Sequence, residues 1–152
     1  MARIENNQGH YLELAPVAYQ FETAEDIDDL NWLEIRVDVS DGVNKWVATN
    51  PVLQTWEVMR LIEWLRQLVA KDETAKAVWK SLEPRLKVER VSDGDQTNFT
   101  VSLAYRFLRL APRDGSSFAR KIELVFASDG TNVLKFARDL EQELKRFPVR
   151  KP

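Results

Sequence analysis

The sequence has no cysteine and only one histidine, His10. Without cysteine the chain has no disulfide, no thiolate metal ligand and no cysteine nucleophile, which fits a reducing cytoplasm. A hydrolytic triad needs a base beside its nucleophile, whereas His10 lies in a polar N-terminal segment of a kind that is often disordered. We therefore expect an exposed His10 and a non-enzymatic protein with no catalytic residue, cofactor or metal.

Long apolar runs and glycine-rich motifs are also missing. No apolar stretch approaches the roughly 18 residues of a membrane-spanning helix, and the first residues lack the apolar core of a signal peptide. The five glycines form neither a G-x-x-x-x-G-K phosphate loop nor a G-x-G-x-x-G turn, which excludes nucleotide chemistry by those routes. We expect a cytoplasmic protein without a membrane partner.

The length of 152 residues suits one domain, residues 1–152, with residues 1–10 as a flexible N-terminus and residues 148–152 as a C-terminal tail. The net charge is −2, but the charges are distributed unevenly along the chain. Residues 1–44 hold ten acidic and two basic side chains, so the rest of the chain carries a net charge of +6. Such an asymmetry either steers a charged partner or is neutralised inside the fold.

The stretch from Asn31 to Leu68 organises the chain. Apolar residues alternate from Leu33 to Val39, which predicts a half-buried strand. Asp41-Gly42 separates this run from a second one at Trp46-Val47, and an Asp-Gly pair between two such runs predicts a hairpin.

A helix follows, with Thr55 as its expected cap. Apolar residues at spacings of three and four predict one stripe that faces the core, from which Trp56 and Met59 deviate. The stripe contains Val58, Leu61, Ile62, Leu65, Leu68 and Val69.

The flanking segments add further strands. Alternation over residues 11–21 predicts an edge-type strand that Pro16 divides, because proline cannot donate to a ladder. Residues 72–82 are ambiguous and are assigned to a helical turn or loop. Alternation over residues 86–107 predicts a second hairpin, and residues 122–126 predict a further strand.

A final amphipathic helix is predicted from the apolar spacing between Val133 and Phe147, with Thr131 or Asn132 as its cap and Pro148 as its stop. The order of segments lacks the regular alternation of a parallel sheet. We expect an α+β fold: a mostly antiparallel sheet of about six or seven strands, with two amphipathic helices packed on one face.

An acidic segment over residues 22–29 has three interpretations. Its carboxylates are the ligands of a hard cation, but a calcium loop starting at Asp26 would need glycine and glutamate where the chain has Asn31 and Val37. The other two are recognition of a partner by the acidic side chains and a solvent-exposed loop with capped amides. The carboxylates are Glu22, Glu25, Asp26, Asp28 and Asp29.

Basic and aromatic side chains mix over residues 105–121, a composition typical of nucleic-acid binding. Tyr105 and Phe107 nevertheless continue the apolar alternation of the preceding strand and are expected in the core. We therefore favour a solvated sheet face, or an internal partner for the acidic third of the chain, over nucleic-acid binding. Trp56 lies off the buried stripe of its helix. We expect it either to pack in an aromatic cluster or to act as an anchor in an interface with a partner.

Several short motifs follow one another along residues 11–91. Together, and in this order, they resemble the WapI-type immunity protein family and its uncharacterised bacterial relatives. The chain departs from the family pattern at Asn50-Pro51-Val52, where Asp-Pro-Cys is expected, and at Arg85, where asparagine is expected after Glu-Pro. The motifs are Tyr19-Gln20-Phe21, Asp28, Asn31-Trp32-Leu33, Trp46, Pro51-x-Leu53-x-Thr55-x-Glu57 and Glu83-Pro84-x-Leu86.

The resemblance implies an intracellular antidote that binds the C-terminal domain of a contact-dependent or secreted polymorphic toxin, which in the type member is a nuclease acting on transfer RNA. An acidic patch suits a basic ribonuclease site, because it steers the encounter and occupies phosphate positions. On this reading the partner-binding residues are Glu22, Glu25, Asp26, Asp28, Asp29 and Trp56.

The alternative is a small-molecule-binding or scaffold domain with a pocket between sheet and helices. An apolar cavity of roughly 300 Å³ or more with convergent polar groups would favour it, whereas a flat acidic face would favour the antidote.

Overall fold

The computed structural model describes the chain except for residues 72–75, 84, 94–95, 105–120 and 128–129. Most of the basic and aromatic segment on which we considered nucleic-acid binding lies outside the described residues. These side chains are Tyr105, Arg106, Phe107, Arg109, Arg113, Phe118 and Arg120.

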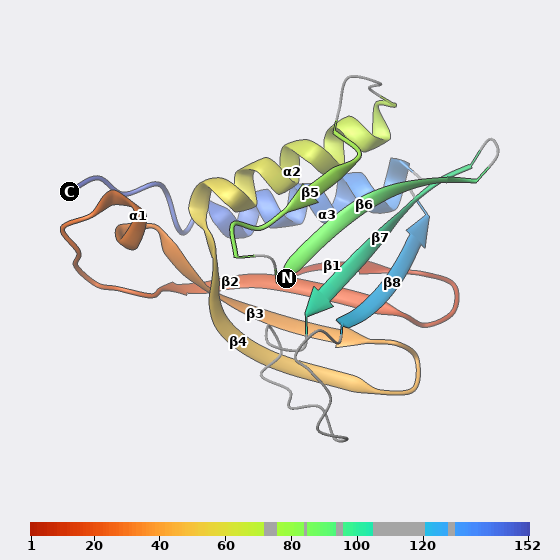
Figure 1. The fold of residues 1–152 in the computed structure, drawn as a ribbon, viewed down its shortest axis with the longest axis horizontal. Helices are drawn as coiled ribbons and strands as arrows, with labels where there is room; N and C mark the ends of the chain where they lie inside the picture. The colour runs from red at the N-terminus through yellow and green to blue at the C-terminus, as the bar shows by residue number, and fades with distance from the viewer. Residues whose placement is uncertain (72–75, 84, 94–95, 105–120, 128–129) are drawn as a thin grey trace.

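The described residues form eight antiparallel strands and three helices (Figure 1). One sheet has the strand order β1 (Ala2–Glu5), β2 (Tyr11–Tyr19), β3 (Trp32–Ser40), β4 (Lys45–Gln54). The other has the order β5 (Val78–Lys80), β6 (Leu86–Asp93), β7 (Gln96–Ala104), β8 (Lys121–Ala127). The helices are α1 (Ile27–Leu30), α2 (Thr55–Val69) and α3 (Gly130–Leu144).

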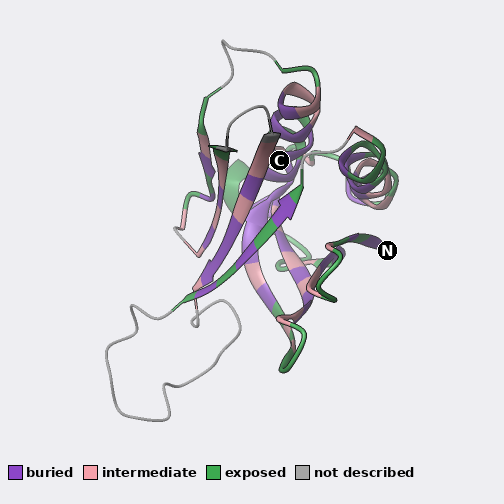
Figure 2. Cartoon of the chain, turned by 90° about the vertical axis from the view of Figure 1, so that its right-hand side faces the viewer, coloured by how far each residue is buried: buried purple, intermediate pink, exposed green. Residues whose placement is uncertain are grey.

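The α+β class, the antiparallel pairing and the two amphipathic helices are confirmed, whereas the strands divide into two sheets instead of forming one. Helices α2 and α3 lie side by side, and α3 also packs on β1 and β2 (Figure 1). Figure 2 shows that the buried positions line the inward faces of these elements.

A single hydrophobic cluster joins both sheets and both long helices. The predicted alternation in β3 is confirmed, since Leu33, Ile35, Val37 and Val39 are all buried. Burial also alternates along the whole of β8. Strands that bury every second residue and helices that bury one stripe thus share one core.

The predicted hairpin at Asp41-Gly42 is confirmed, because β3 and β4 pair from Trp32 with Gln54 to Ser40 with Lys45. Gly42 has a φ of +89°, a left-handed conformation that glycine adopts without steric cost.

The N-terminus differs from the flexible segment that we expected over residues 1–10. Residues Ala2–Glu5 form β1, which pairs with Tyr11–Leu14 of β2, and Ala2 and Ile4 are buried. The expectation is therefore wrong for residues 2–5. Two apolar residues in alternation are too short a pattern to reveal a strand without its partner.

Strand β2 is an inner strand and not the edge strand that Pro16 suggested. Pro16 pairs with Ile35 of β3, but the pairing of β1 with β2 reaches only Leu14. Beyond Leu14 one side of β2 therefore has no partner among the described strands, and a proline nitrogen directed to that side breaks no ladder bond. The register shifts between Pro16 and Ala18.

Both long helices begin at residues other than the predicted caps. Gln54 caps α2, and its backbone N–H donates to Oε2 of Glu57 at 2.8 Å. Thr55 is the first helical residue and is buried. Helix α3 begins at Gly130, so Thr131 and Asn132 lie in its first turn.

Part of the segment over residues 72–82 is a strand and not the helical turn or loop that we expected. Val78–Lys80 form β5, which pairs with Lys87–Glu89 of β6 and buries Trp79. Three residues carry too little periodicity to distinguish a strand from a helical turn.

Candidate functional site

The acidic segment, residues 22–29, lies between β2 and β3 and includes most of the short helix α1. Asp26 has extended backbone geometry, and its Oδ1 accepts the Asp28 N–H at 2.6 Å, which caps α1. The carboxylates of Asp28 and Asp29 lie in the first turn, where they interact favourably with the positive end of the helix dipole. All five predicted carboxylates are exposed to solvent: Glu22, Glu25, Asp26, Asp28 and Asp29.

The side chain of Arg150 holds this segment in place. Its Nε and Nη2 donate to the Leu30 carbonyl at 2.9 Å and 2.6 Å, Nη2 also donates to the Phe21 carbonyl at 2.6 Å, and Nη1 donates to the Glu22 carbonyl at 3.0 Å. The guanidinium thus joins both ends of the acidic segment through its main chain. The five carboxylates stay directed toward solvent.

Buried Asn31 completes this connection. Its Oδ1 accepts the Arg150 backbone N–H at 2.8 Å, and its Nδ2 donates to the Arg150 carbonyl at 2.9 Å and to the Ile27 carbonyl at 2.7 Å. One side chain therefore satisfies polar groups of both α1 and the C-terminal tail, residues 148–152.

Tyr19 supports Arg150 from β2. The guanidinium carbon lies 3.8 Å from the ring centroid, which is within cation–π distance. The Tyr19 hydroxyl donates to the Pro148 carbonyl at 2.5 Å, and the ring makes an edge contact with Phe147 at 5.4 Å between centroids. Burial raises the pKa of the Tyr19 phenol above its ordinary value, and the charge of Arg150 opposes that rise.

Trp56 lies close to the acidic segment. The Thr55 N–H donates to the Asn31 carbonyl at 2.9 Å, which places the start of α2 beside the end of α1. The Trp56 ring is half-buried, and its Nε1 donates to Oε1 of Gln54 at 2.7 Å. The structure therefore brings all six predicted residues to one end of the molecule, where α1, the start of α2 and the C-terminus lie together (Figure 1).

An apolar groove of 470 Å³ lies between α2, the end of α3 and the C-terminal tail. Its apolar surface comes from Met59, Ile62, Leu144, Phe147, Pro148 and Val149. Met59 lies off the buried stripe of α2, as the apolar spacing predicts, but that spacing does not predict a groove. The groove could not be predicted because its walls lie about 75 to 95 positions apart in the sequence.

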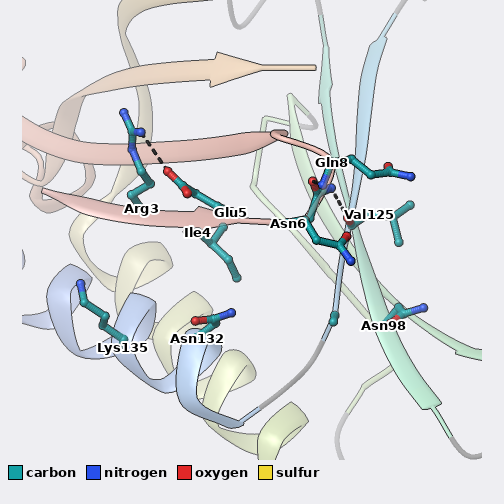
Figure 3. Close-up of a pocket in the computed structure, with 11 residues that line it drawn as sticks. Arg3, Ile4, Glu5, Asn6, Gln8, Asn98, Val125, Asn132 and Lys135 are labelled. Atoms are coloured by element: carbon teal, nitrogen blue, oxygen red, sulfur yellow. Dashed lines mark hydrogen bonds and ion pairs between the residues drawn. The ribbon is translucent and has the colours of Figure 1, made fainter. Parts of the chain in front are cut away.

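A second, larger cavity of 870 Å³ is polar and lies between β1, the β1–β2 turn, β7, β8 and α3 (Figure 3). Asn6 connects two of its walls, the β1–β2 turn and β8. Its Nδ2 donates to the Val125 carbonyl at 3.0 Å, and its Oδ1 accepts the N–H groups of Gln8 and His10 at 2.9 Å and 3.0 Å. Carboxamides dominate its lining: Asn6, Asn7, Gln8, Asn98 and Asn132.

Two buried carboxylates face each other across β2 and β3, a pair that the sequence did not reveal. Glu13 is in register with Asp38. Arg3 binds Glu13 at 2.8 Å, and the Tyr11 hydroxyl donates to Asp38 at 2.8 Å. Like charges placed opposite each other repel, so these partners stabilise the sheet at this position.

Among the residues that the structure describes, no three acidic, histidine or cysteine side chains converge into a metal site. Within the same residues, no helix has both the length and the apolar character needed to cross a bilayer.

A family model described as the immunity protein WapI-like family matches residues 3–148. The chain belongs to this family. The match confirms the resemblance seen over residues 11–91 and extends it to nearly the whole chain. No curated protein and no solved structure matches the sequence.

The matched residues of this WapI-like immunity protein include the acidic segment, Trp56 and the α2 side of the apolar groove. Arg150, which holds the acidic segment, lies two residues beyond the end of the match.

Proposed function

We propose that this WapI-like immunity protein acts in the cytoplasm by binding and neutralising the toxic domain of a bacterial toxin, without catalysis. The observation that carries the proposal is the acidic segment, whose five carboxylates are exposed while its main chain is held by Arg150 and Asn31. A surface that is ordered before binding loses less conformational entropy when a partner docks.

The charge of this surface favours a basic partner. A nuclease concentrates basic side chains where it binds phosphate, so exposed carboxylates steer the encounter and compete for those positions. Trp56 lies at the border of the acidic segment and supplies part of an indole ring as an apolar contact.

The two cavities favour the small-molecule alternative less than the acidic surface favours the antidote. The apolar groove has the volume expected of a ligand site, but two of its charged side chains, Arg66 and Glu141, pair with each other. The larger one is lined mainly by carboxamides and charged side chains, and the smaller one is an apolar groove on the surface. A typical ligand site combines apolar walls with a few convergent polar groups. The acidic surface therefore gives the better supported function.

Co-expression with the toxin domain of a cognate toxin tests the proposal. The test variant changes all five carboxylates of the acidic segment to lysine. We expect the wild-type protein to protect the cell and the variant to fail, with an affinity for an inactivated toxin domain at least about 100-fold weaker.

A matched control changes the same number of carboxylates elsewhere and alters the net charge equally. Exposed ion pairs contribute about 0–1 kcal/mol each, so this control is expected to remain folded and protective. Full protection by the acidic-segment variant would show that the acidic segment is not the surface that binds the toxin. The control residues are Glu5, Glu34, Glu83, Glu89 and Glu123.

A further inference from the structure

The apolar groove exposes side chains that the fold does not cover. Met59 on α2 is 50% exposed and Val149 on the C-terminal tail is 42% exposed. They lie along the groove with Ile62, Leu144 and Phe147, which belong to the buried core. The groove is thus a place where the core reaches the surface.

The charged residues around the groove balance one another. Two acidic and two basic side chains line it, and Arg66 on α2 forms an ion pair with Glu141 on α3 that bridges the helices. The remaining pair of opposite charges is Glu63 and Lys145. A neutral rim around an apolar floor suits an uncharged, apolar side chain.

The groove is continuous with the acidic segment. Thr55 lines the groove, and its N–H donates to the carbonyl of Asn31. Val149 also lines the groove, and the next residue, Arg150, binds the main chain of the acidic segment. The groove and the acidic segment are therefore neighbours, and Figure 1 shows α1, the start of α2 and the C-terminus at the same end of the molecule.

We propose that the groove receives an apolar side chain of the toxin domain, presented next to basic residues that meet the acidic segment. This inference rests on the proposed function and adds the apolar part of the interface. A flexible, polarisable methionine at such a position adapts its shape to the side chain that enters. Apolar anchors surrounded by polar contacts are the usual source of affinity in protein interfaces.

The test replaces the exposed apolar side chains by polar ones without changing charge. Met59→Gln and Val149→Asn are expected to weaken binding to the inactivated toxin domain by about tenfold each, mainly through faster dissociation. Met59→Leu keeps an apolar side chain and is expected to bind within about threefold of the wild-type protein.

Leu134→Gln is the matched control, because Leu134 is 45% exposed on α3 and does not line the groove. Titration calorimetry and thermal unfolding are measured for every variant. Weakened binding by both groove variants, with unchanged unfolding temperatures and a normal control, would support the inference. Wild-type affinity in both groove variants would overturn it and leave the proposed function intact, whereas no binding by the wild-type protein would overturn both.

Discussion

Arg150 determines how the acidic segment is presented. A guanidinium has five N–H donors in a fixed plane, and here it reaches the carbonyls of Phe21, Glu22 and Leu30 together. A lysine ammonium is a point charge on a flexible stem and does not reproduce this arrangement.

Replacing Arg150 by alanine removes these side-chain hydrogen bonds and the contact with the Tyr19 ring. We expect the free energy of unfolding to fall by about 1–2 kcal/mol. Hydrogen exchange is expected to accelerate for the backbone amides of Asp28 to Asn31, because α1 loses its attachment. Denaturant unfolding and hydrogen exchange measure the two effects.

Arg150→Lys is expected to recover little of this loss, and Lys151→Ala serves as the control because Lys151 is exposed. Equal exchange rates for α1 in the wild-type protein and in Arg150→Ala would show that Arg150 does not hold the segment.

At the residue scale, the sequence predicts what is local. Five carboxylates within eight positions are visible directly, and so is the capping role of an aspartate in a turn. The partner of this segment is not visible, since Arg150 lies about 120 positions away. Nothing in the local pattern around Arg150 indicates that its side chain binds main-chain carbonyls.

At the scale of secondary-structure elements, the β3–β4 hairpin depends on a carboxylate in its turn. Oδ1 of Asp41 accepts the N–H groups of Val43 and Asn44 at 2.9 Å and 2.6 Å. The Asn44 backbone N–H, with a smaller contribution from that of Val43, holds the pKa of the Asp41 carboxyl below its ordinary value. These bonds favour the ionised form, which is also the form that closes the turn.

This interaction makes the hairpin sensitive to acid. Because the pKa of Asp41 is lower in the folded state than in the unfolded chain, its stabilising effect is complete above about pH 4 and is lost as the pH falls through the folded-state pKa. We expect an effect below about 1 kcal/mol, since the turn is partly exposed to solvent.

Carbon-detected NMR of the Asp41 carboxyl measures this shift, with the urea-unfolded protein as the reference. The titration midpoint is expected to be lower in the folded protein. Equal midpoints in the two states would contradict the role assigned to the turn.

Long elements were predictable and short ones were not. The alternation in β3, the stripe of α2 and the stripe of α3 extend over enough residues to define a period. Strands β1 and β5 have four and three residues and are defined by their partners β2 and β6. The division into two sheets also escaped prediction, because alternation gives the face of a strand but not its neighbours.

At the scale of the whole molecule, one core stabilises both sheets. Phe136 on α3 is 2% exposed and belongs to the same hydrophobic cluster as residues of β3 and β8. We expect Phe136→Ala to lower the free energy of unfolding by about 3–5 kcal/mol, because it leaves a cavity in this shared core.

Unfolding is expected to follow one transition in the variant as in the wild-type protein, with tryptophan fluorescence and circular dichroism changing together. Leu134→Ala, at an exposed position of the same helix, is expected to change stability by less than about 0.5 kcal/mol. Two separate transitions would show that the sheets have independent cores.

The buried carboxylate of Glu57 connects the two halves of the protein. One oxygen accepts the N–H of Gln54 at the end of β4, and the other accepts the N–H of Leu82 between β5 and β6. Loss of this side chain would loosen the start of α2 and the entry to β6 at once. Under the proposed function, a genetic screen for cells that lose protection would therefore recover Glu57 although its side chain is buried, and the amount of protein left in those cells would separate such lesions from losses at the binding surface.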